Sequence, residues 1–116
     1  DWQIRIEDML DAIHKASEYV EGLDFKSFCS DEKTVDALLR KITVIGEAAC
    51  HVPEEVQERY PELPWLEMRG IRNVIVHEYF QIGLAVLWKT VREDLPAIVP
   101  ELERILSERR LSDEDR

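Results

Sequence analysis

The chain contains little glycine and proline, and this scarcity argues against an all-β domain. Its 116 residues include four glycines and five prolines, too few for the many tight turns that such a domain requires. No apolar run approaches the ~20 residues of a membrane span, and no signal-peptide pattern opens the chain. We therefore expect a helical, cytoplasmic protein that makes no contact with a membrane.

Cysteine is equally scarce. Cys29 and Cys50 have neither the number nor the spacing of a disulfide framework or a zinc site. No glycine-rich phosphate loop, carboxylate pair or His/Cys cluster points to a cofactor or a metal. The sequence therefore predicts two reduced thiols in a cytoplasm, and no cofactor.

The charge balance is strongly acidic. The formal net charge is −10 at pH 7, whereas proteins that bind nucleic acid usually carry a basic face. Charge placement matters more than the sum, because residues 65–77 contain one acid, Glu67, against Arg69 and Arg72. The composition weighs against a nuclease but leaves room for one locally positive face.

Apolar residues recur at steps of three and four along most of the chain, which is the period of an amphipathic helix. Ser30 is the expected N-cap of the second long helix, and Asp94 with Pro96 is expected to end one helix and start another. The pattern predicts an all-α bundle of four to five helices in a single domain, residues 1–111, with a flexible tail at 112–116. The predicted helices cover residues 2–21, 31–51, 64–77, 84–93 and 96–110, and residues 53–59 are expected to form at most one or two helical turns.

Residues 72–79 carry the side chains best suited to chemistry. Arg72 is able to hold a phosphate bidentately and to stabilise charge that develops on it. His77 titrates near neutrality and is able to move protons, and Tyr79 follows two residues later. An arginine and a histidine of this kind are sufficient in principle to cleave a phosphodiester without a metal.

A helical wheel of residues 64–78 separates an apolar face from a polar one. Arg72 and His77 lie at the two edges of the polar face, about 140° apart. They cannot meet within one helix unless the arginine reaches across or the helix distorts, so a symmetric dimer that pairs two such faces is our hypothesis for the functional unit. The apolar face holds Met68, Ile71, Val74 and Ile75, and the polar face holds Arg69, Arg72, Asn73 and His77.

A simpler interpretation stands beside the catalytic one. Polar residues opposite an apolar stripe are usually the solvated face of a helix, and a histidine in a last turn often complements the helix dipole. Tyr79 alone is more often a packing residue than a modified one. His14 and His51 lack comparable neighbours, and we expect no direct role for either.

Residues 68–80 resemble the motif of the HepT-like toxin family, within the HEPN superfamily of helical nucleotide- and RNA-binding proteins. The resemblance covers nearly the whole chain, with one departure at Gly83, where an acidic residue is expected to cap the next helix. Further stretches that resemble the family are residues 24–28, 31–35, 45–49, 60–65 and 94–96.

The resemblance implies a fold, an activity and a partner. The family fold is an up-and-down helical bundle that dimerises so that the motif lines a shared cleft. Its members are ribonucleases of type II toxin–antitoxin pairs, which implies Arg72 and His77 as catalytic residues, with Asn73 and Arg69 in support. The implied partner is a minimal nucleotidyltransferase antitoxin of the MntA type, which modifies the tyrosine at the position of Tyr79 with AMP and so silences the nuclease.

The chemistry of RNA supports the same assignment independently. RNA carries a 2′-hydroxyl beside each phosphate; an imidazole is able to remove its proton, and a guanidinium to stabilise the phosphorane that forms. The expected products are a 2′,3′-cyclic phosphate and a 5′-hydroxyl end, from tRNA or mRNA. The alternative is a non-catalytic helical binding module or partner subunit of a nucleotidyltransferase, and a purely structural oligomerisation domain is a third interpretation.

Overall fold

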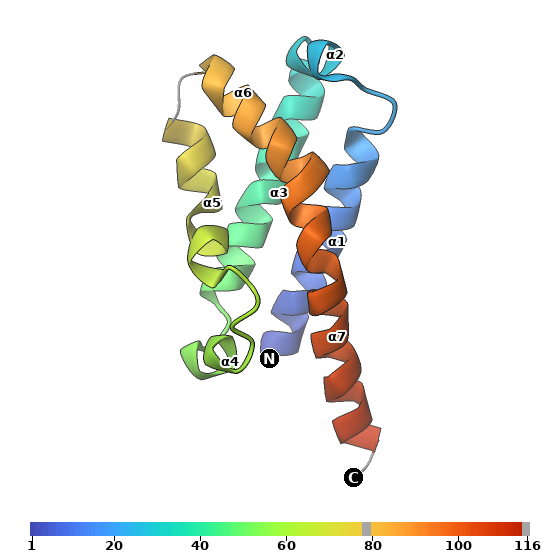
Figure 1. The fold of residues 1–116 in the computed structure, drawn as a ribbon, viewed down its shortest axis with the longest axis vertical. Helices are drawn as coiled ribbons and strands as arrows, with labels where there is room; N and C mark the ends of the chain where they lie inside the picture. The colour runs from blue at the N-terminus through green and yellow to red at the C-terminus, as the bar shows by residue number, and fades with distance from the viewer. Residues whose placement is uncertain (78–79, 115–116) are drawn as a thin grey trace.

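The computed structural model describes the backbone of residues 1–77 and 80–114 and the side chains of residues 1–71, 73 and 83–108. All regular structure in these residues is helical, which confirms the predicted all-α fold. The long helices run alternately up and down, with α3 between α1 and α5 and with α7 packed against α1 (Figure 1). The elements are α1 (Trp2–Tyr19), α2 (Phe25–Cys29), α3 (Glu32–Cys50), α4 (Glu54–Arg59), α5 (Trp65–His77), α6 (Phe80–Lys89), a π-helical turn (Thr90–Asp94) and α7 (Leu95–Glu114).

The core forms where the apolar stripes of the helices meet. The stripe of α1 is buried as its spacing predicts, except that Trp2 at its start is half-buried. Burying this many aliphatic side chains provides the main free energy that holds the helices together. The fully or nearly fully buried residues of α1 and α3 are Ile6, Met9, Ile13, Ala16, Leu38, Ile42, Ile45 and Ala49.

The connection between α1 and α3 contains a short helix that the sequence analysis did not predict. α1 ends at Tyr19, two residues before the predicted end at residue 21, and Gly22 lies in the turn that follows, with a φ of 77°, a left-handed conformation that suits glycine. The Asp24 side chain then accepts a hydrogen bond from the Ser27 backbone at 2.8 Å and caps α2. Phe28 is fully buried, whereas Phe25 is 42% exposed and only borders the core.

The predicted N-cap of α3 was wrong by one residue. Asp31, not Ser30, caps the helix: its carboxylate accepts from the Thr34 backbone N–H at 3.1 Å and from the Thr34 hydroxyl at 2.7 Å. These hydrogen bonds lower the pKa of the Asp31 carboxyl. A carboxylate that accepts two hydrogen bonds and faces the positive end of the helix dipole stabilises this start better than the Ser30 hydroxyl would.

The predicted break around Asp94 and Pro96 is also absent. The chain stays helical from Phe80 onward, and the Leu95 N–H donates to the Thr90 carbonyl across a wide π-helical turn. The wider turn gives room for Pro96, which has no N–H and whose ring would crowd a regular α-helical turn. Gly83 lies inside α6 and is buried, so it is not the cap of a helix that starts at Leu84.

The end of α7 extends past the predicted one. The helix runs to Glu114, whereas the pattern predicted an end near residue 110. The flexible tail predicted at residues 112–116 falls partly outside the described residues and stays a prediction. None of the described helices is long and apolar enough to cross a membrane.

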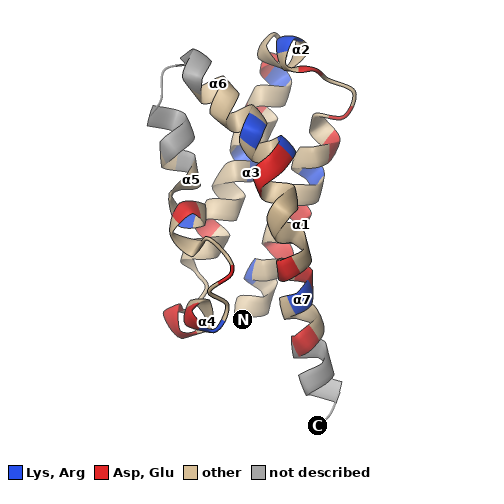
Figure 2. Ribbon diagram, viewed as in Figure 1, with Lys and Arg blue, Asp and Glu red and all other residues tan. Residues whose placement is uncertain are grey.

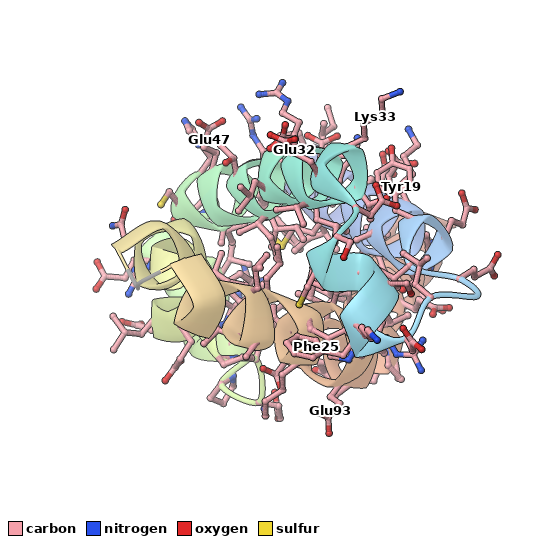
Figure 3. The ribbon with its side chains drawn as sticks, turned by 90° about the horizontal axis from the view of Figure 1, so that it is seen from above. Tyr19, Phe25, Glu32, Lys33, Glu47 and Glu93 are labelled. Carbon is pink, nitrogen blue, oxygen red and sulfur yellow. The ribbon has the colours of Figure 1, made fainter. Side chains whose placement is uncertain are left out.

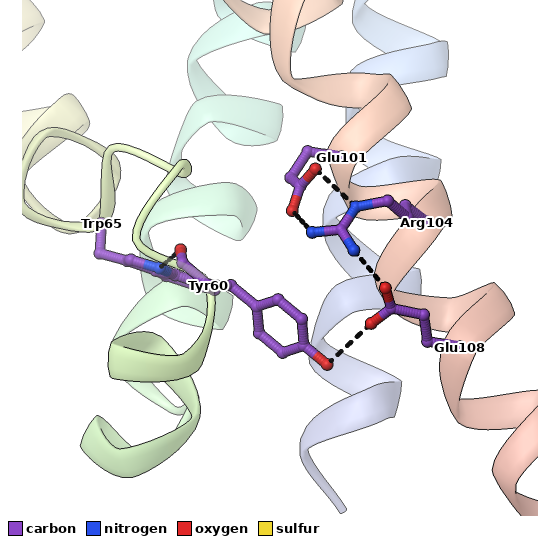
Figure 4. Close-up of polar contacts among 5 residues, drawn as sticks. All are labelled: Tyr60, Trp65, Glu101, Arg104 and Glu108. Carbon is purple, nitrogen blue, oxygen red and sulfur yellow. Dashed lines mark hydrogen bonds and ion pairs between the residues drawn. The ribbon is translucent and has the colours of Figure 1, made fainter.

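The turn that leads into α5 is closed by one hydrogen bond and joined to α7 by another (Figure 4). Trp65 donates from its indole nitrogen to the Tyr60 carbonyl at 2.9 Å, and the Tyr60 hydroxyl donates to a Glu108 carboxylate oxygen at 3.4 Å. Burial, followed by the negative charge of Glu108, raises the pKa of Tyr60, so the hydroxyl keeps the proton that it donates. Arg104 pairs with both Glu101 and Glu108 and holds the acceptor in place. These contacts fix the position of the first turn of α5.

Candidate functional site

The helix that carries the motif is α5, which spans nearly the same residues as the predicted helix 64–77. Met68 is buried and Ile71 is half-buried, as expected for the predicted apolar face. The side chains of Val74 and Ile75 lie outside the described ones. The described half of α5 therefore packs as the wheel predicts.

Gly46 allows α5 to approach α3 closely. A Cβ atom placed on Gly46 would lie 3.4 Å from the Met68 carbonyl oxygen and 3.6 Å from Cγ2 of Ile71. These are ordinary van der Waals distances, so an alanine would fit, whereas a side chain that extends beyond Cβ would push the two helices apart. The close approach sets the walls of the groove described next.

A polar groove of about 460 Å³ runs between α3 and the predicted polar face of α5. Arg69 and Asn73, two of the four residues predicted for that face, are exposed and line it from α5. The opposite wall comes from α3, so the groove joins residues that are 18 to 30 positions apart in the sequence. The α3 residues that line it are Thr43, Gly46, Glu47, Cys50 and His51.

The other predicted site residues follow Arg69 in the sequence, with Arg72 in the middle of α5 beside Asn73, His77 at the end of the helix and Tyr79 after it. Arg72 follows Arg69 by almost one turn. The side chains of both lie outside the described ones, and Tyr79 lies outside the described residues altogether. The pairing of Arg72 with His77 and the role of Tyr79 therefore stay predictions.

Arg69 is held by a buried glutamine of α4. The Gln57 amide nitrogen donates to the carbonyls of Ala49, at 3.3 Å, and Val52, at 2.9 Å. These two acceptors fix the orientation of the amide, so its oxygen faces Arg69, which donates to it at 3.3 Å. The Arg69 guanidinium is thereby directed toward α4, away from the end of α5 that carries His77.

Replacing Gln57 by alanine is expected to destabilise the protein by about 1–3 kcal/mol, because two buried carbonyls at the end of α3 and one arginine lose their partner. Urea denaturation followed by circular dichroism measures the loss. Glu58→Ala, an exposed position on the same short helix, is the matched control and is expected to stay close to the parent. Equal stability of Gln57→Ala and the parent would show that the amide is not needed for this junction.

The α3 wall of the groove was not predicted from the sequence. His51 caps α3, and its Nδ1 lies 2.7 Å from the Glu47 carbonyl oxygen. Thr43, Glu47 and Cys50 recur at steps of three and four on one face of α3, a signal visible in the sequence but uninformative until α5 is known to lie opposite. His14 is exposed on α1 and lines a different groove against α7.

The acidic residues lie mostly away from this groove. Figure 2 shows them concentrated on α4 and along α1 and α7, while α5 carries both signs at its start.

Cys29 and Cys50 are both free thiols, as predicted. Within the part of the chain that the structure describes, no three His, Cys, Asp or Glu side chains come together as metal ligands.

A second groove, of about 450 Å³, lies on the other side of α5, against α6, the π-helical turn and α7. Its walls are mainly apolar and include Leu66, which is 71% exposed, and Ile71. Glu67 also borders it. The two sides of α5 therefore differ in the residues that line them, mostly polar types toward α3 and mostly apolar ones toward α7.

Residues 9–105 match the model of one protein family, described as Ribonuclease HepT-like. The chain is 37% identical over 100 residues to a protein of Thermococcus cleftensis named "Probable ribonuclease HepT", a match that covers 86% of this chain and 91% of that protein. It is 35% identical over 96 residues to a protein of Methanocaldococcus jannaschii named "Putative RNase MJ1380", over 83% of this chain and 88% of that protein. No solved structure matches the chain. The matched range includes all of α5 and both walls of the polar groove.

Proposed function

This chain belongs to the HepT-like ribonuclease family, and from that premise we propose that it is a metal-independent endoribonuclease and the toxin of a type II toxin–antitoxin pair. The observation that carries the proposal is the family match across α5, whose described polar residues Arg69 and Asn73 are exposed beside a groove. The relatives named as ribonucleases support RNA as the substrate.

Arg72 and His77 are the proposed catalytic residues. His77 removes the proton of a ribose 2′-hydroxyl, whose oxygen attacks the adjacent phosphorus while the bond to the 5′-oxygen breaks. Arg72 stabilises the extra negative charge of the phosphorane. The products are a 2′,3′-cyclic phosphate and a 5′-hydroxyl end, and no step requires a metal.

A symmetric homodimer is the proposed active form. The angular separation of Arg72 and His77 on α5, about 140°, keeps them apart within one ideal helix. Two copies of α5 facing each other would place two arginines and two histidines around one cleft. The second histidine, or a water, would then protonate the leaving 5′-oxygen.

Tyr79 is the proposed control point. A minimal nucleotidyltransferase antitoxin would transfer AMP to its hydroxyl, two residues beyond His77. The added phosphodiester brings bulk and negative charge beside the catalytic residues, which repels and excludes the RNA phosphate. Modification would therefore silence the enzyme without unfolding it.

The test is cleavage of total RNA or tRNA by the purified protein in EDTA, after mass spectrometry has confirmed that Tyr79 is unmodified. We expect cleavage that EDTA does not abolish, and product ends that a kinase labels at the 5′-hydroxyl without prior phosphatase treatment. Absence of cleavage across RNA classes would favour the second candidate function, a non-catalytic partner subunit of a nucleotidyltransferase. The net charge of −10 is the observation that favours that candidate.

A further inference from the structure

Three aromatic rings and one guanidinium meet where α2 lies against α6. The ring centroids of Phe25 and Phe28 lie 6.1 Å and 4.9 Å from that of Trp88, and those of the two phenylalanines lie 6.4 Å apart. The guanidinium carbon of Arg92 lies 5.2 Å from the centroid of the Trp88 ring, which is a cation–π distance. These four side chains form what we call the aromatic cluster.

The aromatic cluster has a closed side and an open side. Phe28 is fully buried and Trp88 is half-buried, whereas Phe25 is 42% exposed and Arg92 is exposed. Contacts with two neighbouring rings limit the orientations of Phe25, which lies between α2 and α6 (Figure 3). A ring that is already held in place loses little conformational freedom when a ligand stacks on its exposed part.

Two positive charges accompany the open side of the aromatic cluster. Lys26 lies next to Phe25 in α2 and is exposed, and Arg92 lies over Trp88. Neither of these cations forms an ion pair with a described side chain. Aromatic rings beside cations are the combination with which proteins bind single-stranded nucleic acid, because the bases stack on the rings and the phosphates attract the cations.

The acids of this region do not neutralise these two cations. Asp24 caps α2, and its carboxylate accepts two hydrogen bonds there, both at 2.8 Å. Asp94 pairs with Lys89 at 2.8 Å. Glu93 extends away from the body of the protein (Figure 3). Both cations of the open side are therefore able to meet a polyanion.

We propose that the aromatic cluster binds one base of a single-stranded RNA segment. The base stacks on the exposed part of Phe25, while Lys26 and Arg92 attract the adjoining phosphates. Every base has a π-face, so the cluster detects an unpaired base and not its identity. The bases of a duplex stay stacked on one another, so duplex RNA does not bind in this way.

The aromatic cluster lies near the proposed catalytic residues without including them. The short helix α2, the end of α5 and the start of α6 lie at the same end of the bundle (Figure 1). Trp88 follows the start of α6 at Phe80 by eight residues, about 12 Å along the helix axis. This length exceeds the ~3.4 Å step between stacked bases, so the bound base belongs to a nucleotide that flanks the cleaved bond. The inference rests on the proposed function only for the identity of the ligand as RNA.

The experiment measures binding rather than cleavage. Short single-stranded oligonucleotides with 2′-O-methyl riboses cannot undergo attack by the 2′-oxygen. One oligonucleotide carries uracil at every position, and a second of the same length and charge is abasic. Titration followed by fluorescence anisotropy is expected to show that the parent binds the uracil oligonucleotide about tenfold more tightly than the abasic one.

Three variants separate stacking from charge. Phe25→Leu keeps an apolar side chain but loses the ring, so it is expected to bind the uracil oligonucleotide about tenfold more weakly than the parent and the abasic one equally well. Phe25→Tyr keeps the ring and is expected to bind both as the parent does. Arg92→Gln is expected to lower the slope of log affinity against log salt concentration by about 0.7, the value for one phosphate contact in a single strand.

Tyr19→Leu is the matched control for Phe25→Leu. Tyr19 is 37% exposed, close to the value for Phe25, but it ends α1 on a different side of the bundle (Figure 3), so RNA binding is expected to equal that of the parent. Equal binding of the two oligonucleotides by the parent, or binding by Phe25→Leu that matches Tyr19→Leu, would overturn the proposal. If Phe25→Leu instead binds RNA normally but loses self-association in sedimentation, the cluster is a contact between copies of the chain.

The outcome is independent of catalysis because these oligonucleotides cannot be cleaved. A chain that cuts no RNA still passes this test if its binding depends on the ring of Phe25. A chain that cuts RNA but binds it without that ring fails this test alone.

Discussion

Replacing His77 by alanine is expected to lower the rate of RNA cleavage by about 10²–10⁴-fold, the contribution that a positioned general acid or base typically makes. The effect should fall on kcat, because the imidazole acts on a proton that moves in the transition state and not on the bound ground state. Single-turnover cleavage of a labelled RNA measures it. Binding of an uncleavable 2′-O-methyl RNA is expected to change little.

His14→Ala is the matched control for that experiment. His14 is exposed on α1 and borders a different groove, so cleavage by this variant should equal that of the parent. If His77→Ala cleaves RNA as fast as His14→Ala, His77 is not the catalytic base. A loss of RNA binding equal to the loss of rate would instead assign His77 to binding.

Mixing two inactive variants tests the shared cleft. If each active site takes Arg72 from one protomer and His77 from the other, a dimer of Arg72→Ala with His77→Ala retains one intact site. Random exchange makes about half of the dimers mixed, so about a quarter of the parent activity is expected to return. No recovery after confirmed subunit exchange would place both residues of a site on one protomer.

The long helices were predictable because the spacing of their apolar residues indicates which face of each helix is buried. Ile6, Met9 and Ile13 recur at steps of three and four, and all are buried. The same spacing of apolar residues continues across the helix break predicted near Asp94, since Leu87, Val91 and Leu95 follow at steps of four and are all buried. Local propensity at Asp94 and Pro96 favoured a new helix start, and tertiary packing of this stripe outweighed it.

The candidate site was predictable only on its own helix. A wheel of α5 places Arg69 and Asn73 on one face, but no pattern within residues 64–77 says which helix lies opposite. Glu47 and His51 reach the groove because Gly46 lets α3 touch α5, a pairing that exists only in the folded chain. The α3 wall could therefore not be predicted from the residue pattern of any single helix.

Replacing Phe28 by alanine is expected to have the largest effect on stability, about 3–5 kcal/mol. Phe28 is fully buried, and its ring centroid lies 4.9 Å from that of Trp88 on α6. Removing the ring loses its transfer free energy, leaves a cavity, and breaks an aromatic contact between α2 and α6. Urea denaturation followed by circular dichroism measures the difference.

Phe25→Ala separates burial from aromatic contact. Phe25 lies in the same short helix, on the side of α6 (Figure 3), with its ring centroid 6.1 Å from that of Trp88, yet it is 42% exposed. Its truncation leaves no closed cavity, so a loss of about 1 kcal/mol is expected. Equal losses in the two variants would mean that the cavity left by Phe28 collapses.

A total stability of about 5–15 kcal/mol is usual for domains, so the loss of free energy of unfolding in Phe28→Ala would be a large part of it. The short helix α2, which no periodic pattern predicted, would then be a principal support of α6, the helix that follows the proposed catalytic residues.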